Sequence, residues 1–96
     1  MPLYRCTIPK DLIPYDVRER IAQEITRIHC EVTGAPATFV HVFMFEDSDR
    51  NDIAIDGSIR HGRTDEQKQS LVDQMQRTVA HQAGIGLGSV TVRTLD

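Results

Sequence analysis

The sequence predicts an α+β fold in which two β-α-β units form a four-stranded sheet with both helices on one face. Its 96 residues, 40% hydrophobic and 26% charged, suit one globular domain. Short apolar segments alternate with two longer segments of helical periodicity. The pattern also recurs after about 50 residues, so that Ile21 falls on Leu71 and Gly34 on Gly84. We therefore expect a single domain over residues 1–96, with a repeat comprising residues 1–46 and 53–96.

The first unit is predicted to begin with a strand over Leu3–Ile8. A helix then starts near Pro14, because the missing amide hydrogen of proline costs nothing at the first helical position. Five apolar residues at helical spacing define its buried face: Val17, Ile21, Ile25, Ile28 and Val32. Gly34 and Pro36 end this helix, and Phe39–Glu46 is a second strand that is apolar on both faces.

The second unit is expected to contain a strand over Ile53–Ile59, a helix from Thr64 and a last strand over Val90–Leu95. Thr64 and Gln67 have the spacing of a capping box, in which each residue satisfies a backbone amide of the other. The buried face of this helix is expected to comprise four apolar residues: Leu71, Val72, Met75 and Val79. Three glycines within residues 84–88 indicate a flexible loop before the last strand.

The predicted topology leaves one face of the sheet uncovered. Right-handed crossovers place both helices on the same face. A strand that is apolar on both faces is expected where a sheet lies between helices and a partner subunit. A domain of this size is also only marginally stable alone. We therefore expect an oligomer, with a homotrimer as the leading hypothesis.

Composition argues against several classes of partner. The net charge of −3, with no face rich in Lys or Arg, disfavours nucleic acid. No apolar run approaches the roughly 20 residues of a membrane span. The first residues carry no signal-peptide pattern, so we expect a cytoplasmic protein. In a reducing compartment Cys6 and Cys30 are expected to be small buried apolar residues.

The four histidines do not predict a metal site. His29 lies one position off the apolar stripe of the first helix, where solvent could satisfy it, and His41 lies among apolar strand residues. His61 and His81 are expected to be exposed. No pair has the spacing of metal ligands with a third ligand nearby, so we expect no metal.

Pro2 is the first candidate for chemistry. Removal of Met1 would leave Pro2 as a free secondary amine. Desolvation and nearby cations lower the pKa of an amine, so such a group can act as a general base near neutral pH. The alternative is that Met-Pro is an ordinary start of a chain.

A second candidate is the segment Arg60-His61-Gly62-Arg63, which follows the third strand. Two guanidinium groups there could hold a carboxylate by paired hydrogen bonds. The alternative is a solvated basic turn. Pro2 and this turn can meet only if the site runs along the edge of the sheet where the first and third strands are neighbours.

The sequence resembles the tautomerase superfamily, whose members are β-α-β proteins with an amino-terminal proline. Pro2, Tyr4, the Ile25–His29 segment and Thr33-Gly34 are similar to cis-3-chloroacrylic acid dehalogenase-like proteins. The stretch from Ile59 to Lys68 resembles the start of 4-oxalocrotonate tautomerase-like and trans-3-chloroacrylic acid dehalogenase subunits. Together these segments span most of the chain.

The resemblance implies a role for each matching residue. Pro2 would be the catalytic amine, and Arg60 and Arg63 would bind and polarise the carboxylate of a small substrate. His29 would donate a hydrogen bond to the substrate, and Tyr4 would line the pocket. The dehalogenases also use a carboxylate to activate water. Possible substitutes for it in this chain match no motif: Glu46, Asp47 and Asp96.

The leading functional hypothesis is a cofactor-independent enol-keto tautomerase of a 2-oxo or 2-hydroxydienoate acid, with Pro2 as general base. One alternative is a hydratase, dehalogenase or decarboxylase of a 3-haloacrylate-like or 3-oxo acid, with protonated Pro2 as general acid. Another is a non-catalytic binding module on the same layout, because a fold does not determine a function.

Overall fold

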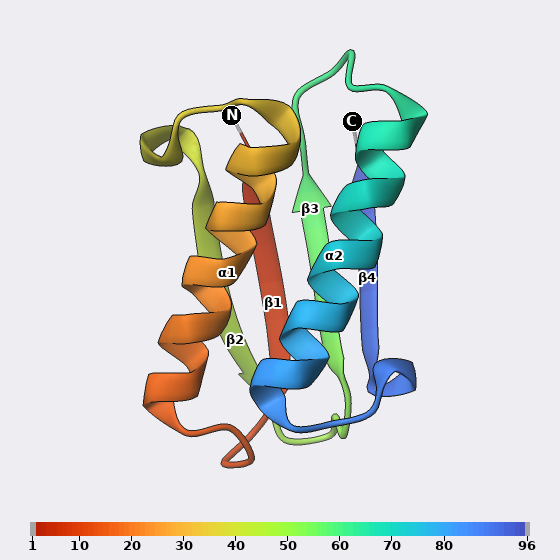
Figure 1. Ribbon diagram of the computed structural model, residues 1–96. Helices are drawn as coiled ribbons and strands as arrows, with labels where there is room; N and C mark the ends of the chain where they lie inside the picture. Colours follow the sequence, from red (N-terminus) through yellow and green to blue (C-terminus); the bar gives the residue numbers. More distant parts are fainter. Residues whose placement is uncertain (1, 96) are drawn as a thin grey trace.

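The computed structural model describes residues 2–95. The elements follow the order β-α-β-β-α-β, with a short 3₁₀ turn before each parallel partner strand. Their bounds are β1 Leu3–Pro9, α1 Tyr15–Thr33, 3₁₀ turn Ala37–Phe39, β2 His41–Asp47, β3 Ile53–Ser58, α2 Asp65–Ala83, 3₁₀ turn Leu87–Ser89 and β4 Val90–Leu95. Both helices lie on one face of the sheet (Figure 1), which confirms the predicted α+β fold class.

The four strands are ordered β2-β1-β3-β4. β1 runs parallel to β2 and antiparallel to β3, so the two halves of the chain meet at the centre of the sheet. Leu3 at the start of β1 lies opposite Ser58 at the end of β3. This register brings the beginning of the chain next to the turn between β3 and α2.

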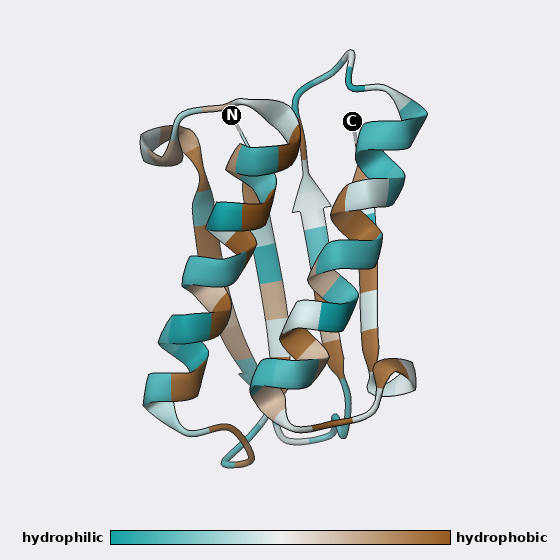
Figure 2. Cartoon of the chain, in the orientation of Figure 1, coloured by the Kyte–Doolittle hydropathy of each residue, from teal (hydrophilic) through white to brown (hydrophobic). Residues whose placement is uncertain are grey.

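The core lies between the sheet and the two helices. Alternate β1 residues Tyr4, Cys6 and Ile8 are fully buried, as the period of two in a strand requires. Each helix adds buried apolar residues along one face: Ile21, Ile25 and Ile28 from α1, and Leu71, Met75 and Val79 from α2. Figure 2 shows these apolar segments recurring along both helices between hydrophilic ones. Each such side chain contributes about 1.5–3 kcal/mol through burial, so this layer stabilises the fold.

Local signals at the helix ends agree largely with the predictions. The capping box is present: the Gln67 amide donates to Thr64 Oγ1 at 3.1 Å, and the Thr64 amide donates to Gln67 Oε1 at 3.0 Å. Gly34 ends α1 in the left-handed conformation, with φ of 78°. Pro14 is the N-cap with extended backbone, and helix α1 begins one residue later than predicted.

The predicted second strand starts two residues too early. Phe39 belongs to a 3₁₀ turn in which its amide donates to the Pro36 carbonyl at 3.1 Å. An apolar residue in a short turn is indistinguishable from the start of a strand by periodicity alone. This turn exposes 55% of Phe39 and directs the chain around the end of the sheet.

The outer face of the sheet is apolar on one side and polar on the other. Phe43 and Phe45 of β2 are 48% and 43% exposed, and Arg5 of β1 lies over the Phe45 ring at 5.1 Å. Across the sheet, Arg93 Nη2 pairs with Asp56 Oδ1 at 2.9 Å. The uncovered apolar surface of the sheet comprises Phe43 and Phe45 on β2, together with Leu95 at the end of β4, which is 67% exposed. Neither helix is long and apolar enough to cross a membrane within residues 2–95.

Both cysteines are free thiols. Cys6 is fully buried, and burial raises the pKa of its thiol to about 12, while Cys30 is half-buried. His61 and His81 are exposed, as predicted, and His41 is half-buried.

Candidate active site

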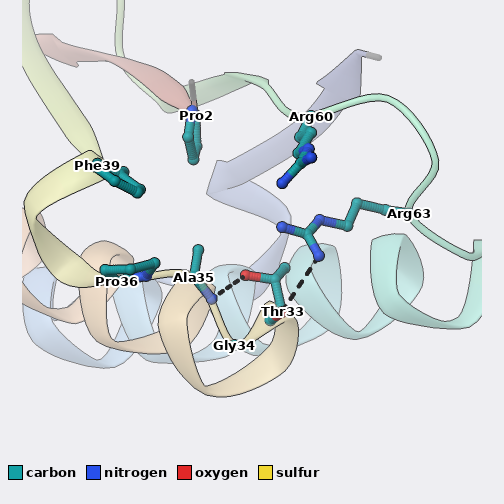
Figure 3. Close-up of a pocket in the computed structure, with 8 residues that line it drawn as sticks. All are labelled: Pro2, Thr33, Gly34, Ala35, Pro36, Phe39, Arg60 and Arg63. Carbon is teal, nitrogen blue, oxygen red and sulfur yellow. Dashed lines mark hydrogen bonds between the residues drawn. The ribbon is translucent and has the colours of Figure 1, made fainter.

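A cavity of about 490 Å³ lies at the end of the sheet where β1 begins. It is bounded by the start of β1, the end of α1 with the turn that follows it, and the segment between β3 and α2 (Figure 3). Its lining comprises Pro2, Thr33, Gly34, Ala35, Pro36, Phe39, Arg60 and Arg63. Three of the predicted site residues, Pro2, Arg60 and Arg63, thus meet in one cavity.

Pro2 is held in the cavity by the sheet. Pro2 is buried, and its carbonyl accepts a hydrogen bond from the His41 amide at 3.1 Å. The antiparallel pairing of β1 with β3 then places it beside Arg60, which follows β3 by two residues. The sequence made their approach conditional on a site along the edge of the sheet, whereas the structure places the cavity at the ends of the two central strands, β1 and β3. Met1 lies outside the described residues.

The two arginines form the cationic side of the cavity. Arg60 is exposed, and Arg63 is half-buried with Nη1 donating to the Thr33 carbonyl at 3.2 Å. Thr64, the N-cap of α2, follows Arg63 directly, so the capping box fixes the backbone that carries this arginine. In Figure 3 both guanidinium groups point toward the space beside Pro2.

The opposite side of the cavity is apolar. Ala35, Pro36 and Phe39 follow α1 and face the arginines across the cavity (Figure 3). No binding role was predicted for these residues from the sequence. The sequence feature that could have pointed to them is their place in the chain, because they come soon after the Thr33-Gly34 pair that carries part of the family resemblance. The cavity therefore suits a molecule with an anionic end and an apolar end.

Tyr4 and His29 lie behind the cavity and do not line it. Both are fully buried, and the Tyr4 hydroxyl lies 2.7 Å from His29 Nδ1. Their rings meet edge to face, with centroids 5.5 Å apart. The expectation of a solvated boundary histidine is wrong, because the Tyr4 hydroxyl supplies the polar partner that allows His29 into the interior.

Burial determines the protonation of this pair. It raises the pKa of the Tyr4 phenol far above its usual range. It also lowers the pKa of His29, and the positive charge of Arg63 lowers it further. At neutral pH the pair is therefore a protonated phenol beside a neutral imidazole.

The carboxylates considered for activating water lie elsewhere. Glu46 and Asp47 pair with Ile8 and Pro9 at the far end of β1. The length of that strand separates them from Pro2 by about 20 Å. Glu46 also accepts a hydrogen bond from Arg18 Nη1 at 2.9 Å, which is the main cause of its lowered pKa. Asp96 lies outside the described residues.

The chain matches a known protein family and several solved structures. Residues 1–85 match the family described as "Putative oxalocrotonate tautomerase enzyme". The crystal structure of native Ps01740 has 28% identity and a TM-score of 0.90, covering 98% of this chain and 92% of that one. N1, a member of the cis-3-chloroacrylic acid dehalogenase family, has 25% identity and a TM-score of 0.88, covering 96% and 72%.

A fused 4-OT, described as a wild-type symmetric trimer, shares the fold. It has 17% identity and a TM-score of 0.89, covering 98% of this chain and 84% of that one. Among curated proteins no sequence matches this chain.

Proposed function

Because this chain belongs to the oxalocrotonate tautomerase family, within the tautomerase superfamily, we propose that it is a cofactor-independent enol-keto tautomerase of a small carboxylate. The substrate class is a 2-oxo or 2-hydroxydienoate acid, and Pro2 is the general base. The observation that carries this proposal is the meeting of Pro2 with Arg60 and Arg63 in one cavity.

The proposed reaction is a proton transfer within a bound anion. Arg60 and Arg63 hold the substrate carboxylate and stabilise the negative charge that develops on the neighbouring oxygen. The Pro2 amine takes a proton from the enol hydroxyl and returns it to carbon, which completes the enol-to-keto conversion. The two nearby cations and the buried setting favour the neutral, proton-accepting form of such an amine. A positioned base of this kind contributes roughly 10²- to 10⁴-fold to the rate.

The two sides of the cavity determine how the substrate would lie. Its carboxylate would face the arginines, and the rest of the molecule would lie against Pro36 and Phe39. Since the only cationic side chains in the lining are on one side, a monocarboxylate with an apolar remainder fits better than a dicarboxylate. Phenylenolpyruvate has this form and is the probe we choose.

The likeness to N1 favours a second candidate, a hydratase, dehalogenase or decarboxylase with protonated Pro2 as general acid. Hydration needs a carboxylate that activates water, and Glu46 and Asp47 lie at the far end of β1. Enol-keto transfer needs only the amine and the cations, so we place it first. A pH-rate profile separates the two, because a general base loses activity toward low pH and a general acid loses it toward high pH.

We also propose a homotrimer, in which the exposed phenylalanines of β2, Phe43 and Phe45, are covered by a partner subunit. The symmetric trimer of the fused 4-OT supports this assembly. Light scattering should give the mass of three chains. A clean monomer at micromolar concentration would refute the proposal.

The deciding experiment concerns the amine of Pro2. With phenylenolpyruvate, protein that begins at Pro2 should be the most active and Pro2→Ala, which keeps a primary amine, less active. Protein that retains Met1, verified by mass, should be least active, since the amine is then an amide that accepts no proton at neutral pH. Circular dichroism should show the same fold in all three. Equal activity of the Met1-retained form would exclude Pro2 as the base and favour a different site or a binding module.

A further inference from the structure

Gln67 lies at the start of α2, close in the chain to the turn that carries both arginines of the cavity. Its side-chain amide makes two hydrogen bonds in different directions. The oxygen, Oε1, accepts from the Thr64 amide at 3.0 Å as part of the capping box. The nitrogen, Nε2, donates to the Val32 carbonyl of α1 at 3.4 Å. Gln67 therefore joins the start of α2 to the end of α1.

A second hydrogen bond runs between the same two segments. Arg63 Nη1 donates at 3.2 Å to the carbonyl of Thr33, the residue that follows Val32 (Figure 3). The last carbonyls of a helix have no partner within that helix, so donors from elsewhere can satisfy them. Gln67 and Arg63 thus bond to consecutive carbonyls, and the end of α1 fixes where the Arg63 guanidinium lies.

The capping box alone does not require glutamine at position 67. Glutamate serves the same purpose, and its negative charge suits the positive end of the helix dipole. An ionised carboxylate, however, cannot donate to the Val32 carbonyl. It would also lie close to the Arg63 guanidinium, because the two side chains reach neighbouring carbonyls, and would compete with a bound anion for it. The amide of Gln67 holds the turn without adding a negative charge beside Arg63.

The first half of the chain has no such donors at the matching positions. At the shift of 50 residues, Arg63 matches Ile13, and Gln67 matches Val17. Ile13 is buried in the apolar core and Val17 packs against it. Neither side chain can donate a hydrogen bond. The pair of bonds from Gln67 and Arg63 is therefore particular to the end of the sheet that holds the cavity, which favours a role in the site over a general role in the fold.

We propose that Gln67 is a positioning residue: by donating to the Val32 carbonyl, it holds the Arg63 guanidinium where the substrate carboxylate binds. This inference rests on the proposed function, because that proposal assigns the carboxylate to Arg63. Gln67 does not line the cavity, so it acts through the turn that carries the arginine.

The deciding variant is Gln67→Glu, which keeps the cap of α2 but loses the Nε2 donor. KM for phenylenolpyruvate should rise by about 2- to 13-fold, the equivalent of one neutral hydrogen bond, with little change in kcat. The melting temperature should stay close to that of the wild type, because glutamate caps the helix as glutamine does. An unchanged KM, whatever the melting temperature, would overturn the proposal.

Gln74→Glu is the matched control. Gln74 is also a half-buried glutamine of α2, but its Nε2 donates to Ser70 Oγ of the same helix at 2.8 Å. A carboxylate there can still accept from the serine hydroxyl, and the change in charge is the same. Both kinetic constants should equal those of the wild type. An equal rise of KM in this control would assign the effect to net charge and overturn the positioning role.

A neutral variant shows whether Gln67 acts through Arg63. Gln67→Met loses the donor without adding charge, and it should also raise KM. Arg63→Ala removes the guanidinium, so adding Gln67→Met to it should cause no further rise. Additive effects in this double variant would mean that Gln67 acts by another route, and the proposal would fail.

Titration with phenylpyruvate, followed by nuclear magnetic resonance, separates this inference from the proposed function. The dissociation constant should rise in Gln67→Glu by about the same factor as KM, and should not change in Gln74→Glu. If the processed wild type binds phenylpyruvate but has no tautomerase activity, the proposed function fails, and the two affinities still test Gln67. If the wild type is active and Gln67→Glu binds phenylpyruvate equally tightly, the inference alone fails. A wild type that neither binds nor converts these probes would refute both.

Discussion

At one end of the sheet, the start of β1, the end of α1 and the β3–α2 turn surround the candidate active-site cavity. At the other end, the start of β3, the end of α2 and the β1–α1 turn have the same relation to one another (Figure 1). The two helices have equal length, 19 residues, and both end at a glycine in the left-handed conformation. The backbone at the two ends is therefore built by the same sequence of elements.

The side chains at the two ends differ. Pro2, the residue before β1, corresponds to Asp52, the residue before β3, which is half-buried and carries a carboxylate. The two halves of the chain superpose in sequence at a shift of 50 residues, which matches Arg63 with Ile13 and His29 with Val79. Ile13 and Val79 are both buried in the apolar core. Ile13 and Val79 are thus apolar at one end, whereas at the other end Pro2 and Arg63 line a cavity, with the imidazole of His29 behind it. The fold thus offers two equivalent positions, and the residue types decide which one becomes a site.

The largest expected effect comes from removing the guanidinium of Arg63. Arg63→Ala should lower kcat/KM for phenylenolpyruvate by about 10- to 150-fold, because a charge-assisted hydrogen bond contributes roughly 1.5–3 kcal/mol. Arg60→Ala should have a smaller effect in the same direction, since Arg60 is exposed and Arg63 is half-buried. The control is Arg77→Ala, which removes an exposed arginine of α2. Unchanged kinetics in Arg63→Ala would mean that the basic turn is merely solvated.

A smaller effect, on stability, is expected at Gly57. Gly57→Ala should reduce the free energy of unfolding by about 1–3 kcal/mol, because the new methyl group overlaps the Tyr4 ring. Gly88→Ala is the matched control: its Cβ would meet no atom within 4 Å. Urea unfolding of both variants measures the difference. Equal stabilities would show that the Tyr4 ring relaxes without cost and that the close approach is unimportant.

His29 is a titratable residue, whereas Val79, at the matching position of α2, is not. The pH dependence of stability tests this difference. The pKa of His29 is lowered in the folded state, so below about pH 6.5 the unfolded chain binds a proton that the folded chain does not. Stability should then fall with decreasing pH by up to about 1.4 kcal/mol per unit. His29→Val should remove this component, whereas His81→Val, at an exposed histidine, should retain it. An unchanged slope in His29→Val would contradict the buried neutral imidazole.

The smallest expected effect concerns the starts of the helices. α2 has a capping box at Thr64, whereas α1 starts at Pro14 without a side-chain cap. Thr64→Ala should cost about 1 kcal/mol of unfolding free energy and loosen the turn that carries Arg63. Thr38→Ala, at an exposed threonine of the 3₁₀ turn between α1 and β2, should change stability by less than about 0.5 kcal/mol. If the two variants were equally stable in thermal unfolding, the capping box would not anchor this turn.

The elements of secondary structure could be predicted from the sequence because their signals are local. The apolar stripe from Ile21 to Ile28, the capping box of Thr64 and Gln67, and the glycine at position 34 each depend on residues within a few turns. The predicted boundaries were wrong where a residue type is compatible with two local structures, as with Phe39, which lies in a 3₁₀ turn and was predicted to begin a strand. Three candidate site residues, Pro2, Arg60 and Arg63, were also predicted from the sequence, and the structure brings them to one cavity.

Only the tertiary structure decided how these groups meet. The pairing of Leu3 with Ser58 places Pro2 near Arg60, although more than half of the chain separates the two residues in sequence. Such a register depends on the packing of whole strands. The burial of His29 depends on a hydroxyl 25 residues away, and the space for that tyrosine depends on Gly57 in a third element. Periodicity places a residue on a face of its own helix or strand, but the partner it meets there is set by packing between elements. For that reason the sequence alone determined the helices, the strands and the candidate groups, whereas the cavity, its apolar wall and the Tyr4–His29 contact were decided by the folded chain.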